Sequence, residues 1–247
     1  MEKYQEYRQH FKNPTITEES DQRKGLPLPP IEKEVPKGAK LIDLISPDDF
    51  SIPDIPLLQA INNRVSRRKY TEESLTLEEL SFLLWTTQGV KEVAREGRIT
   101  MRTVPSGGAM HPFETYLLIN RVEGLQPGLY RYIATQHKLL PVITEKVGDF
   151  PEQINDICNL QTFVGKSAVV FIWTARPYRT EWRYREDSLK DILMSVGHIC
   201  QNLYLAVEAI KSGTVAIVAY NQEKLDKFLQ IDGWDEISLY VAPVGKI

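Results

Sequence analysis

The feature that most constrains the fold is a long apolar helical pattern over residues 188–211. Its apolar side chains recur at alternating spacings of four and three residues, at Leu189, Leu193, Val196, Cys200, Leu203, Val207 and Ile210. Further apolar residues flank this stripe, among them Ile192, Met194, Ile199 and Leu205. A helix that is apolar nearly all round has to lie in the middle of a domain or in an interface between subunits.

Strand-like segments both precede and follow this helix in the sequence. Runs rich in β-branched and aromatic residues predict strands at 115–122, 129–134, 138–143, 168–175, 214–220 and 238–247. Helical patterns are expected at 56–64, 76–89, 151–160 and 222–231. In the second, Thr76 and Glu79 fit a capping box and Gly89 a C-terminal stop. Because several predicted strands are adjacent in sequence, the chain is expected to be α+β, with a mostly antiparallel sheet flanked by helices.

The first 55 residues differ from the rest in composition. They are polar and rich in proline, as in "GLPLPPIEKEVPKG", and proline favours extended chain without amide donors. We expect residues 1–55 to form an N-terminal arm outside the core and residues 56–247 to form one domain.

Composition argues against several kinds of protein, among them nucleic-acid-binding, secreted and membrane-spanning proteins. The net charge of −3 argues against a nucleic-acid partner. The charged N-terminus lacks the apolar core of a secretory signal, and no run of 18 apolar residues occurs, so a cytoplasmic protein without a membrane span is expected. Cys158 and Cys200 lie in apolar stretches and are expected to be buried thiols. The four histidines form no metal-binding motif, so no metal site is predicted.

Three stretches carry residues suited to chemistry. The first, "NRVSRRKY" (63–70), offers Arg64, Ser66, Arg67 and Arg68, and arginine forks with a hydroxyl suit a phosphate group. The alternative is a solvated basic helix end. The second, "PSGGAMHPFE" (105–114), has two glycines through which a flat ring or a phosphate could approach the main chain. The alternative is a simple turn before a strand.

Residues within and after these stretches leave further choices open. His111 is expected either to face a ligand or to serve as a structural hydrogen-bonding group. Glu114 is expected either to pair with a nearby arginine or to be exposed. The third stretch combines "TVAIVAYN" with "APVGK", where small residues could lie under a flat ligand and Lys246 could reach a phosphate. The alternative there is that small residues only make room for helix packing.

The order of these motifs resembles the FMN-dependent nitroreductase superfamily, and within it the SagB-type group of thiazole/oxazole-forming oxidase-like dehydrogenases. The matching motifs are R-x-S-x-R-x-Y, "LTLEELSFLLWTTQG", "PSGGAMHPFETYLL", "GHICQNLYLAVEA", "AIVAYN" and "PVGK". They extend over residues 25 to 247. The resemblance implies a nitroreductase-like fold in an intertwined homodimer, with FMN bound between the subunits.

The resemblance also implies which residues hold the cofactor. Arg64, Ser66 and Arg68 correspond to the phosphate and ribityl site. The isoalloxazine ring is expected to lie against the other subunit's counterparts of Pro105, Ser106, Gly107 and Gly108, and against Val218 and Ala219 near N5, with Lys246 as a further phosphate partner. Many family members carry asparagine where this chain has Ala109, so one flavin contact is absent.

The implied activity is hydride transfer between FMN and a small molecule or an azoline-containing peptide. In azoline oxidases of this group a Lys-Tyr pair removes the accompanying proton, and this chain has Arg183-Tyr184 at the matching place. Arginine stays protonated and is a poor base. Tyr184 is therefore the candidate proton-transfer residue, with a structural tyrosine as the alternative. Two further functions stay open: NAD(P)H-dependent reduction of nitro compounds or quinones, and a non-catalytic flavin-binding dimer in a biosynthetic complex.

Overall fold

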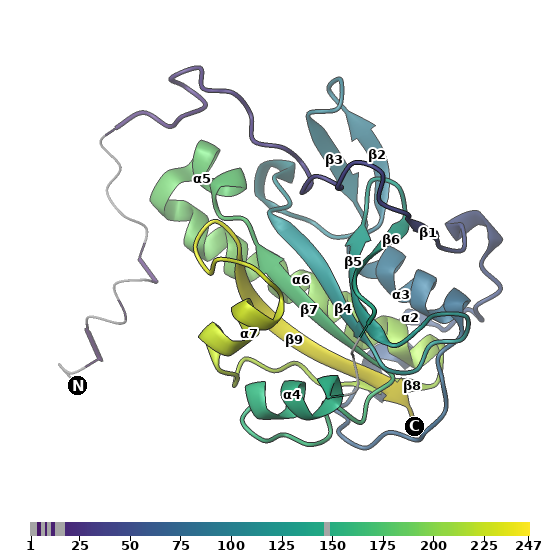
Figure 1. Cartoon of the computed structure of the whole chain (residues 1–247). Coiled ribbons are helices and arrows are strands. Elements are labelled where there is room, and N and C mark those ends of the chain that lie inside the picture. Colours follow the sequence, from purple (N-terminus) through teal and green to yellow (C-terminus); the bar gives the residue numbers. More distant parts are fainter. Residues whose placement is uncertain (1–3, 6–7, 9–10, 13–17, 146–148) are drawn as a thin grey trace.

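The computed structural model describes residues 4–5, 8, 11–12, 18–145 and 149–247, so most of the chain before residue 18 lies outside the described residues. A seven-stranded sheet forms the centre of the molecule, in the order β1-β6-β5-β4-β7-β9-β8 (Figure 1). All the ladders in this sheet are antiparallel. The strands are β1 (Ile42–Asp43), β4 (Phe113–Ile119), β5 (Gly128–Ile133), β6 (Lys138–Ile143), β7 (Val169–Ala175), β8 (Ser212–Thr214) and β9 (Ile237–Lys246).

Helices cover both faces of the sheet. They are α2 (Leu57–Asn63), α3 (Leu77–Gln88), α4 (Phe150–Ile157), α5 (Tyr178–Tyr184), α6 (Ser188–Ala209) and α7 (Gln222–Phe228). Side chains of α3 and α6 share one buried cluster, and those of α4 and α7 share the other. The expected α+β architecture with a mostly antiparallel sheet and a long central helix is therefore confirmed.

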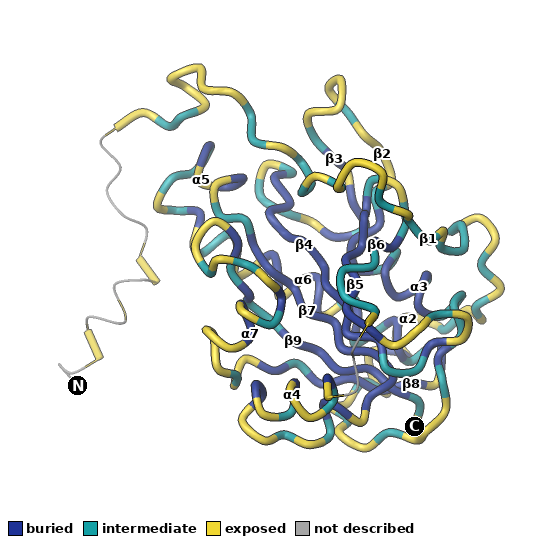
Figure 2. The backbone as a smooth tube through the Cα atoms, viewed as in Figure 1, coloured by how far each residue is buried: buried dark blue, intermediate teal, exposed yellow. Residues whose placement is uncertain are grey.

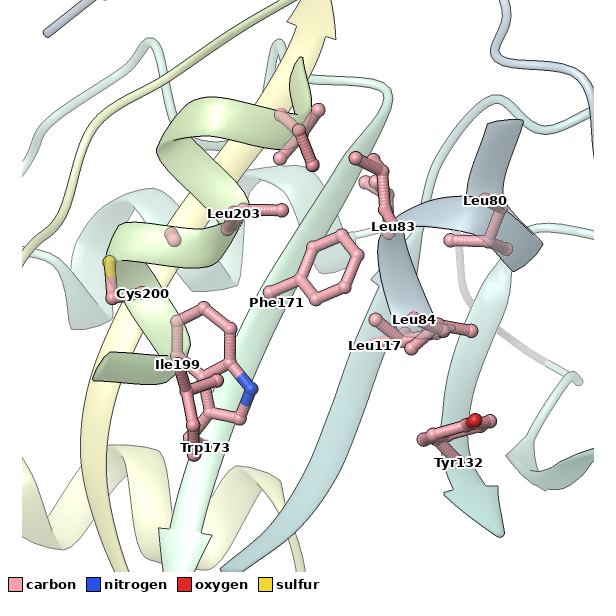
Figure 3. Packing of buried hydrophobic residues seen from close by; sticks show 14 of the residues in the cluster. Leu80, Leu83, Leu84, Leu117, Tyr132, Phe171, Trp173, Ile199, Cys200 and Leu203 are labelled. Carbon is pink, nitrogen blue, oxygen red and sulfur yellow. The ribbon is translucent and has the colours of Figure 1, made fainter. Parts of the chain in front are cut away.

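Strand β7, next to the middle strand β4, shows why the sheet needs helices on both faces. Phe171 and Trp173 point into the cluster with α3 and α6, whereas Val170 and Ile172 belong to the cluster with α4 and α7 (Figure 3). Successive side chains of a strand alternate between faces, so an uninterrupted apolar run is buried on both. Figure 2 shows this buried layer running through β4, β7 and β9.

The predicted boundaries of α3 are confirmed by its capping groups. The Thr76 hydroxyl accepts a hydrogen bond from the Glu79 amide at 3.1 Å, and the Glu79 carboxylate accepts one from the Thr76 amide at 2.9 Å. The helix ends where Gly89 donates its amide to the Trp85 carbonyl at 2.8 Å.

The prediction of one strand over 214–220 is wrong for most of its length. Strand β8 ends at Thr214, and beyond it Ile217 forms an isolated bridge to Val241. The chain leaves the ladder because the Ala216 amide donates to the Tyr204 hydroxyl of α6 at 2.8 Å instead of to a neighbouring strand. A hairpin of β2 (Val90–Ala94) and β3 (Ile99–Arg102) was not predicted, since charged residues interrupt its alternation.

The sequence predicts that the N-terminal arm lies outside the core, but the structure shows that part of the arm packs against it. Strand β1 pairs with β6, and Ile42 packs against the main cluster. The Glu32 carboxylate accepts the Ala134 amide at 2.6 Å, and the Lys33 ammonium lies 2.7 Å from a Glu236 carboxylate oxygen. These contacts fix the chain from about residue 30 onward to the sheet and to the loops that join its strands.

Helix α6 is buried on one face and open on the other. Ile199 and Leu203 are fully packed against the sheet, but Leu193 is 51% and Met194 54% exposed. The sequence predicts a helix buried on nearly all sides, but within a single chain only one side of α6 is buried. Among the described residues, none of the helices is long and apolar enough to cross a membrane.

Candidate functional site

The first candidate segment is the glycine loop, residues 105–111, which leads into β4. It contains a short 3₁₀ turn at Gly107–Ala109, and the His111 amide donates to the Ser106 hydroxyl at 3.2 Å. Gly108 has φ 57°, Ala109 57° and His111 41°. Non-glycine residues seldom adopt this left-handed conformation, so the surrounding contacts must hold the loop in place.

Side chains of the same subunit fill the space beside the two glycines. A Cβ atom on Gly107 would overlap the Asp191 carboxylate of α6. One on Gly108 would lie 2.5 Å from the Tyr184 hydroxyl and 2.9 Å from a guanidinium nitrogen of Arg183. The sequence had suggested that these glycines leave room for a flavin edge and a partner chain. In the structure, the space beside these glycines is occupied by Asp191, Arg183 and Tyr184 of the same chain.

Burial shifts the pKa of two groups at the loop. It raises the pKa of the Asp191 carboxyl, against the lowering effects of the Gly107 amide and of His198. Burial also lowers the pKa of His111 to about 3, helped by the charge of Arg102 and opposed by a hydrogen bond to the Thr100 carbonyl. His111 is thus a neutral side chain, 3% exposed. Its hydrogen bond to the Thr100 carbonyl favours the structural alternative, while its Nδ1 has no hydrogen-bond partner among the described residues.

The second candidate segment is the arginine segment, residues 64–68, which follows α2. The Arg64 guanidinium lies 5.6 Å from the centre of the Tyr204 ring, and the Ser66 and Tyr204 hydroxyls are 3.1 Å apart. The Arg67 amide donates to the Thr214 carbonyl at 2.9 Å. Among the described residues, Arg64 and Arg68 form no ion pair with a carboxylate. Their charge is therefore available to an anion, and the residues present fit a phosphate group.

The remaining predicted cofactor residues have different surroundings. The Lys246 ammonium pairs with the Glu79 carboxylate and donates to the Ile210 carbonyl at 2.9 Å. Val218 is 72% exposed, and the Ala219 carbonyl accepts the Gln161 side chain at 3.3 Å. Lys246 thus already has an anionic partner, whereas Val218 offers an open apolar surface.

Helix α6 contacts both candidate segments, and sequence reasoning missed the residues through which it does so. Asp191 lies against the glycine loop and Tyr204 against the arginine segment. They are 13 positions apart, which corresponds to about 20 Å along the helix. The sequence carries no clear signal, because Asp191 and Tyr204 are two of several polar residues in this helix.

A buried charge cluster lies under the start of β4. Glu114 forms ion pairs with Arg179 at 2.5 Å and Arg131 at 3.7 Å, and accepts the Lys33 amide at 2.8 Å. Glu114 therefore pairs with arginine rather than being exposed, which settles the choice left open by the sequence. Cys158 and Cys200 are free and buried as expected. In the described part of the chain, no group of histidine, cysteine and acidic residues could hold a metal ion.

Two curated relatives resemble the chain in sequence. MJ1384 of Methanocaldococcus jannaschii, named as a nitroreductase, is 32% identical over 79% of this chain and 93% of its own length. The trifolitoxin operon protein TfxC of Rhizobium leguminosarum is 24% identical over 87% of this chain. The alignment covers 62% of TfxC, so the chain spans less than two thirds of that relative.

Solved structures share the fold. A nitroreductase-type chain from Anabaena variabilis superimposes with a TM-score of 0.69 at 22% identity, over 85% of this chain and 42% of that longer one. The microcin synthetase McbBCD complex of Escherichia coli gives 0.61 at 22% identity, over 87% and 78%. A Desulfovibrio desulfuricans structure in complex with FMN gives 0.52 at 16% identity, over 78% and 87%.

A family model describes most of the chain. The model of the nitroreductase family matches residues 61–246, which include α2 from its middle, the glycine loop, α6 and all of β9. Together with the identity to MJ1384, this match establishes that the chain belongs to the nitroreductase family.

Proposed function

We propose that the protein is an FMN-dependent oxidoreductase that works in the cytoplasm as a homodimer, with FMN between the subunits. The substrate is a small molecule or an azoline-containing peptide, as in the SagB-type group. The observation that carries the proposal is the arginine segment, where Arg64 lies over the Tyr204 ring and neither Arg64 nor the exposed Arg68 has a carboxylate partner among the described residues.

The arginine segment supplies the phosphate end of the proposed site. Arg64 is oriented by the Tyr204 ring, and Ser66 by the Tyr204 hydroxyl. Two guanidinium groups and a hydroxyl can together donate several charge-assisted hydrogen bonds to one phosphate. Lys246 contributes less in this proposal, because Glu79 already neutralises its charge.

The outer faces of α2 and α6 support the homodimer. Leu57, Leu58 and Ile61 of α2 are half or more exposed, as are Leu193 and Met194 of α6, and the two helices pack together. An apolar surface of this kind is typical of a subunit interface. If two α6 helices pack in opposite directions, the glycine loop of one subunit approaches the arginine segment of the other. That arrangement brings together two segments that lie about 20 Å apart along α6 in one chain.

FMN, when bound, supplies the hydride chemistry. The chain's own contribution is orientation and proton handling. The Tyr184 hydroxyl lies beside Gly108, where a side chain would overlap it, and the Arg183 guanidinium lies 5.3 Å from the centre of the Tyr184 ring. In this proposal Tyr184 gives or takes the proton that accompanies hydride transfer, and Arg183 holds its ring in place.

TfxC and the McbBCD complex support the choice of a SagB-type role, since their names connect them with trifolitoxin and microcin production. The nitroreductase naming of MJ1384 favours the alternative, reduction of nitro compounds or quinones by NAD(P)H. Anaerobic mixing with NADPH separates the two. Rapid bleaching of the flavin absorbance is expected for a reductase, and slow bleaching for the azoline oxidase proposed here.

The proposal is tested by cofactor binding and mass. The purified protein is expected to be yellow or to become so with FMN, and to have the mass of a dimer by light scattering. Arg64→Ala and Arg68→Ala should each weaken FMN binding by about tenfold or more. Lys91→Gln removes an exposed cation from β2 and is the matched control. A colourless monomer that ignores added FMN would refute the proposal.

Catalysis is tested separately with Tyr184→Phe. Turnover of a thiazoline or oxazoline peptide should fall, while FMN content stays at the wild-type level. Equal turnover would remove Tyr184 from proton transfer. A yellow wild-type dimer that turns over neither these peptides nor nitro compounds would favour the non-catalytic alternative.

A further inference from the structure

A cavity of 640 Å³ lies between the arm and the β2–β3 hairpin, next to the glycine loop. We call it the arm–hairpin groove. It is lined by the arm residues Gln22 and 26–31, by Arg95, Gly97, Arg98 and Ile99 of the hairpin, and by Met110, Trp182 and Arg183. Its volume is within the range of pockets that bind organic ligands. Figure 1 shows the arm passing from beside α5 to the hairpin. Residues of all three elements line the groove.

The walls of the groove are apolar and its rim is cationic. Leucine, proline, isoleucine, methionine and tryptophan side chains form the walls. Arg95, Arg98 and Arg183 supply three positive charges, and the lining includes no acidic residue. Arg98 has one acidic neighbour, Glu96, at 3.9 Å, and both side chains are largely exposed. Since an exposed pair of this kind contributes little, the rim carries a net positive charge that favours an anionic ligand.

The arm wall is held in place by hydrogen bonds to α5. The Trp182 indole donates to the Leu26 carbonyl at 3.1 Å, and the Arg179 guanidinium donates to the Pro30 carbonyl at 2.8 Å. The Gln22 amide also donates to the Trp182 carbonyl at 2.9 Å. A wall fixed at both ends is preorganised, so binding a ligand does not require the conformational entropy of the wall to be lost.

The length and the free amides of the wall favour an extended chain over a compact molecule. Its six consecutive residues, 26–31, can span up to about 20 Å. Prolines occupy three of these positions, and in the described part of the chain neither the Leu28 nor the Ile31 amide donates a hydrogen bond. Free amide donors in a proline-rich wall suit the carbonyl groups of a peptide laid beside it.

The groove leads to the candidate site. Met110 belongs to the glycine loop, and Arg183 stacks on Tyr184. A second cavity of 370 Å³ shares Gln22 and Arg183 with the groove and has Tyr184 in its lining. A chain lying in the groove could therefore present a neighbouring residue to Tyr184.

We propose that the arm–hairpin groove binds an extended peptide segment that carries both acidic and apolar side chains, and that it thereby delivers the substrate to Tyr184. The apolar side chains pack on the arm wall, and the carboxylates pair with Arg95, Arg98 and Arg183. Delivery to Tyr184 rests on the proposed function, but binding in the groove does not.

Fluorescence anisotropy of the full-length protein tests this binding. The probe is a labelled peptide of alternating aspartate and leucine, and the control peptide has asparagine in place of each aspartate. The acidic peptide is expected to bind about tenfold more tightly than the control, and more weakly at high salt. The double variant Arg95→Gln, Arg98→Gln should lose about tenfold in affinity. Lys91→Gln, on the same hairpin but outside the groove, should bind within twofold of wild type.

Equal binding of the two peptides would overturn the inference, and so would equal affinities of the double variant and wild type. Displacement of the acidic peptide by an equimolar amount of NADPH would assign the groove to a dinucleotide and would also overturn it. FMN content is measured on every sample. A yellow protein that does not select the acidic peptide refutes the groove alone, whereas a colourless protein that selects it refutes only the FMN proposal.

Discussion

The glycine loop and the arginine segment are both contacted by α6, but they are held in different ways. The glycine loop has left-handed residues and is packed against Asp191, Arg183 and Tyr184 of its own chain. The arginine segment is held by a backbone hydrogen bond and by Tyr204, and Arg68 is exposed. The glycine loop is fixed by packing within its own chain, whereas the arginine segment carries positive charges that are not paired with carboxylates among the described residues. Mutations should therefore affect stability at the loop and ligand binding at the segment.

The largest expected effect on stability is at Gly107. Gly107→Ala puts a methyl group into the space of the Asp191 carboxylate, and overpacking of this kind costs about 1–3 kcal/mol. Urea unfolding followed by circular dichroism measures the loss. In an Asp191→Ala background, which removes the overlapping carboxylate, the same substitution should cost clearly less. An equal loss in both backgrounds would show that Asp191 does not constrain the loop.

The next effect is the pH dependence that His111 gives to stability. Its pKa is about 3 in the folded chain, well below its ordinary value, so acid protonates the unfolded state first. This contribution to stability is complete above about pH 6.5 and is lost as the pH falls toward 3. Between about pH 7 and pH 5 it should lower the free energy of unfolding by about 2 kcal/mol.

His111→Gln tests the assignment of this pH dependence. The variant should show a shallower fall in the free energy of unfolding between neutral pH and pH 5, whatever its stability at neutral pH. If the variant and wild type lose stability equally over this range, His111 is not the group responsible.

A smaller effect is expected at Tyr204, which links α6 to the arginine segment. Tyr204→Phe keeps the ring under Arg64 but loses the hydroxyl contacts with Ser66 and with the Ala216 amide. The loss should be about 1 kcal/mol of stability, with weaker FMN binding as a second readout. Tyr178→Phe, which removes the hydrogen bond of an exposed tyrosine to Asp21 of the arm, serves as the control for loss of a hydroxyl contact. An FMN affinity unchanged in Tyr204→Phe would show that Ser66 does not depend on this hydroxyl.

The smallest effect on stability is expected at Arg68. Arg68→Lys should change the free energy of unfolding by less than about 0.5 kcal/mol, because the side chain is exposed. FMN binding should nevertheless weaken, though less than in Arg68→Ala, because lysine keeps the charge but loses the planar fork. If Arg68→Lys destabilised the fold as strongly as Gly107→Ala, the contrast between the two segments would fail.

The fold could be read from patterns that depend on neighbouring residues. The alternation that buries Phe171 and Val170 on opposite faces, and the capping box of α3, are local features that the sequence displays directly. Segments whose conformation depends on residues far away in the sequence were harder to predict. Residues 215–220 have strand-like composition but leave the ladder for Tyr204, and the polar arm is held by Glu236 and Ala134 from far along the chain.

The sequence by itself determined the α+β class, the central helix and the order of the motifs on which the family resemblance rests, because periodicity and capping are properties of a few consecutive residues. Only the tertiary structure decided that the glycines of the loop accommodate Asp191 and Tyr184, that Glu79 neutralises Lys246, and that one face of α6 remains open. The physical reason is that each of these depends on side chains brought together by packing, and their separation in sequence gives no local signal of it.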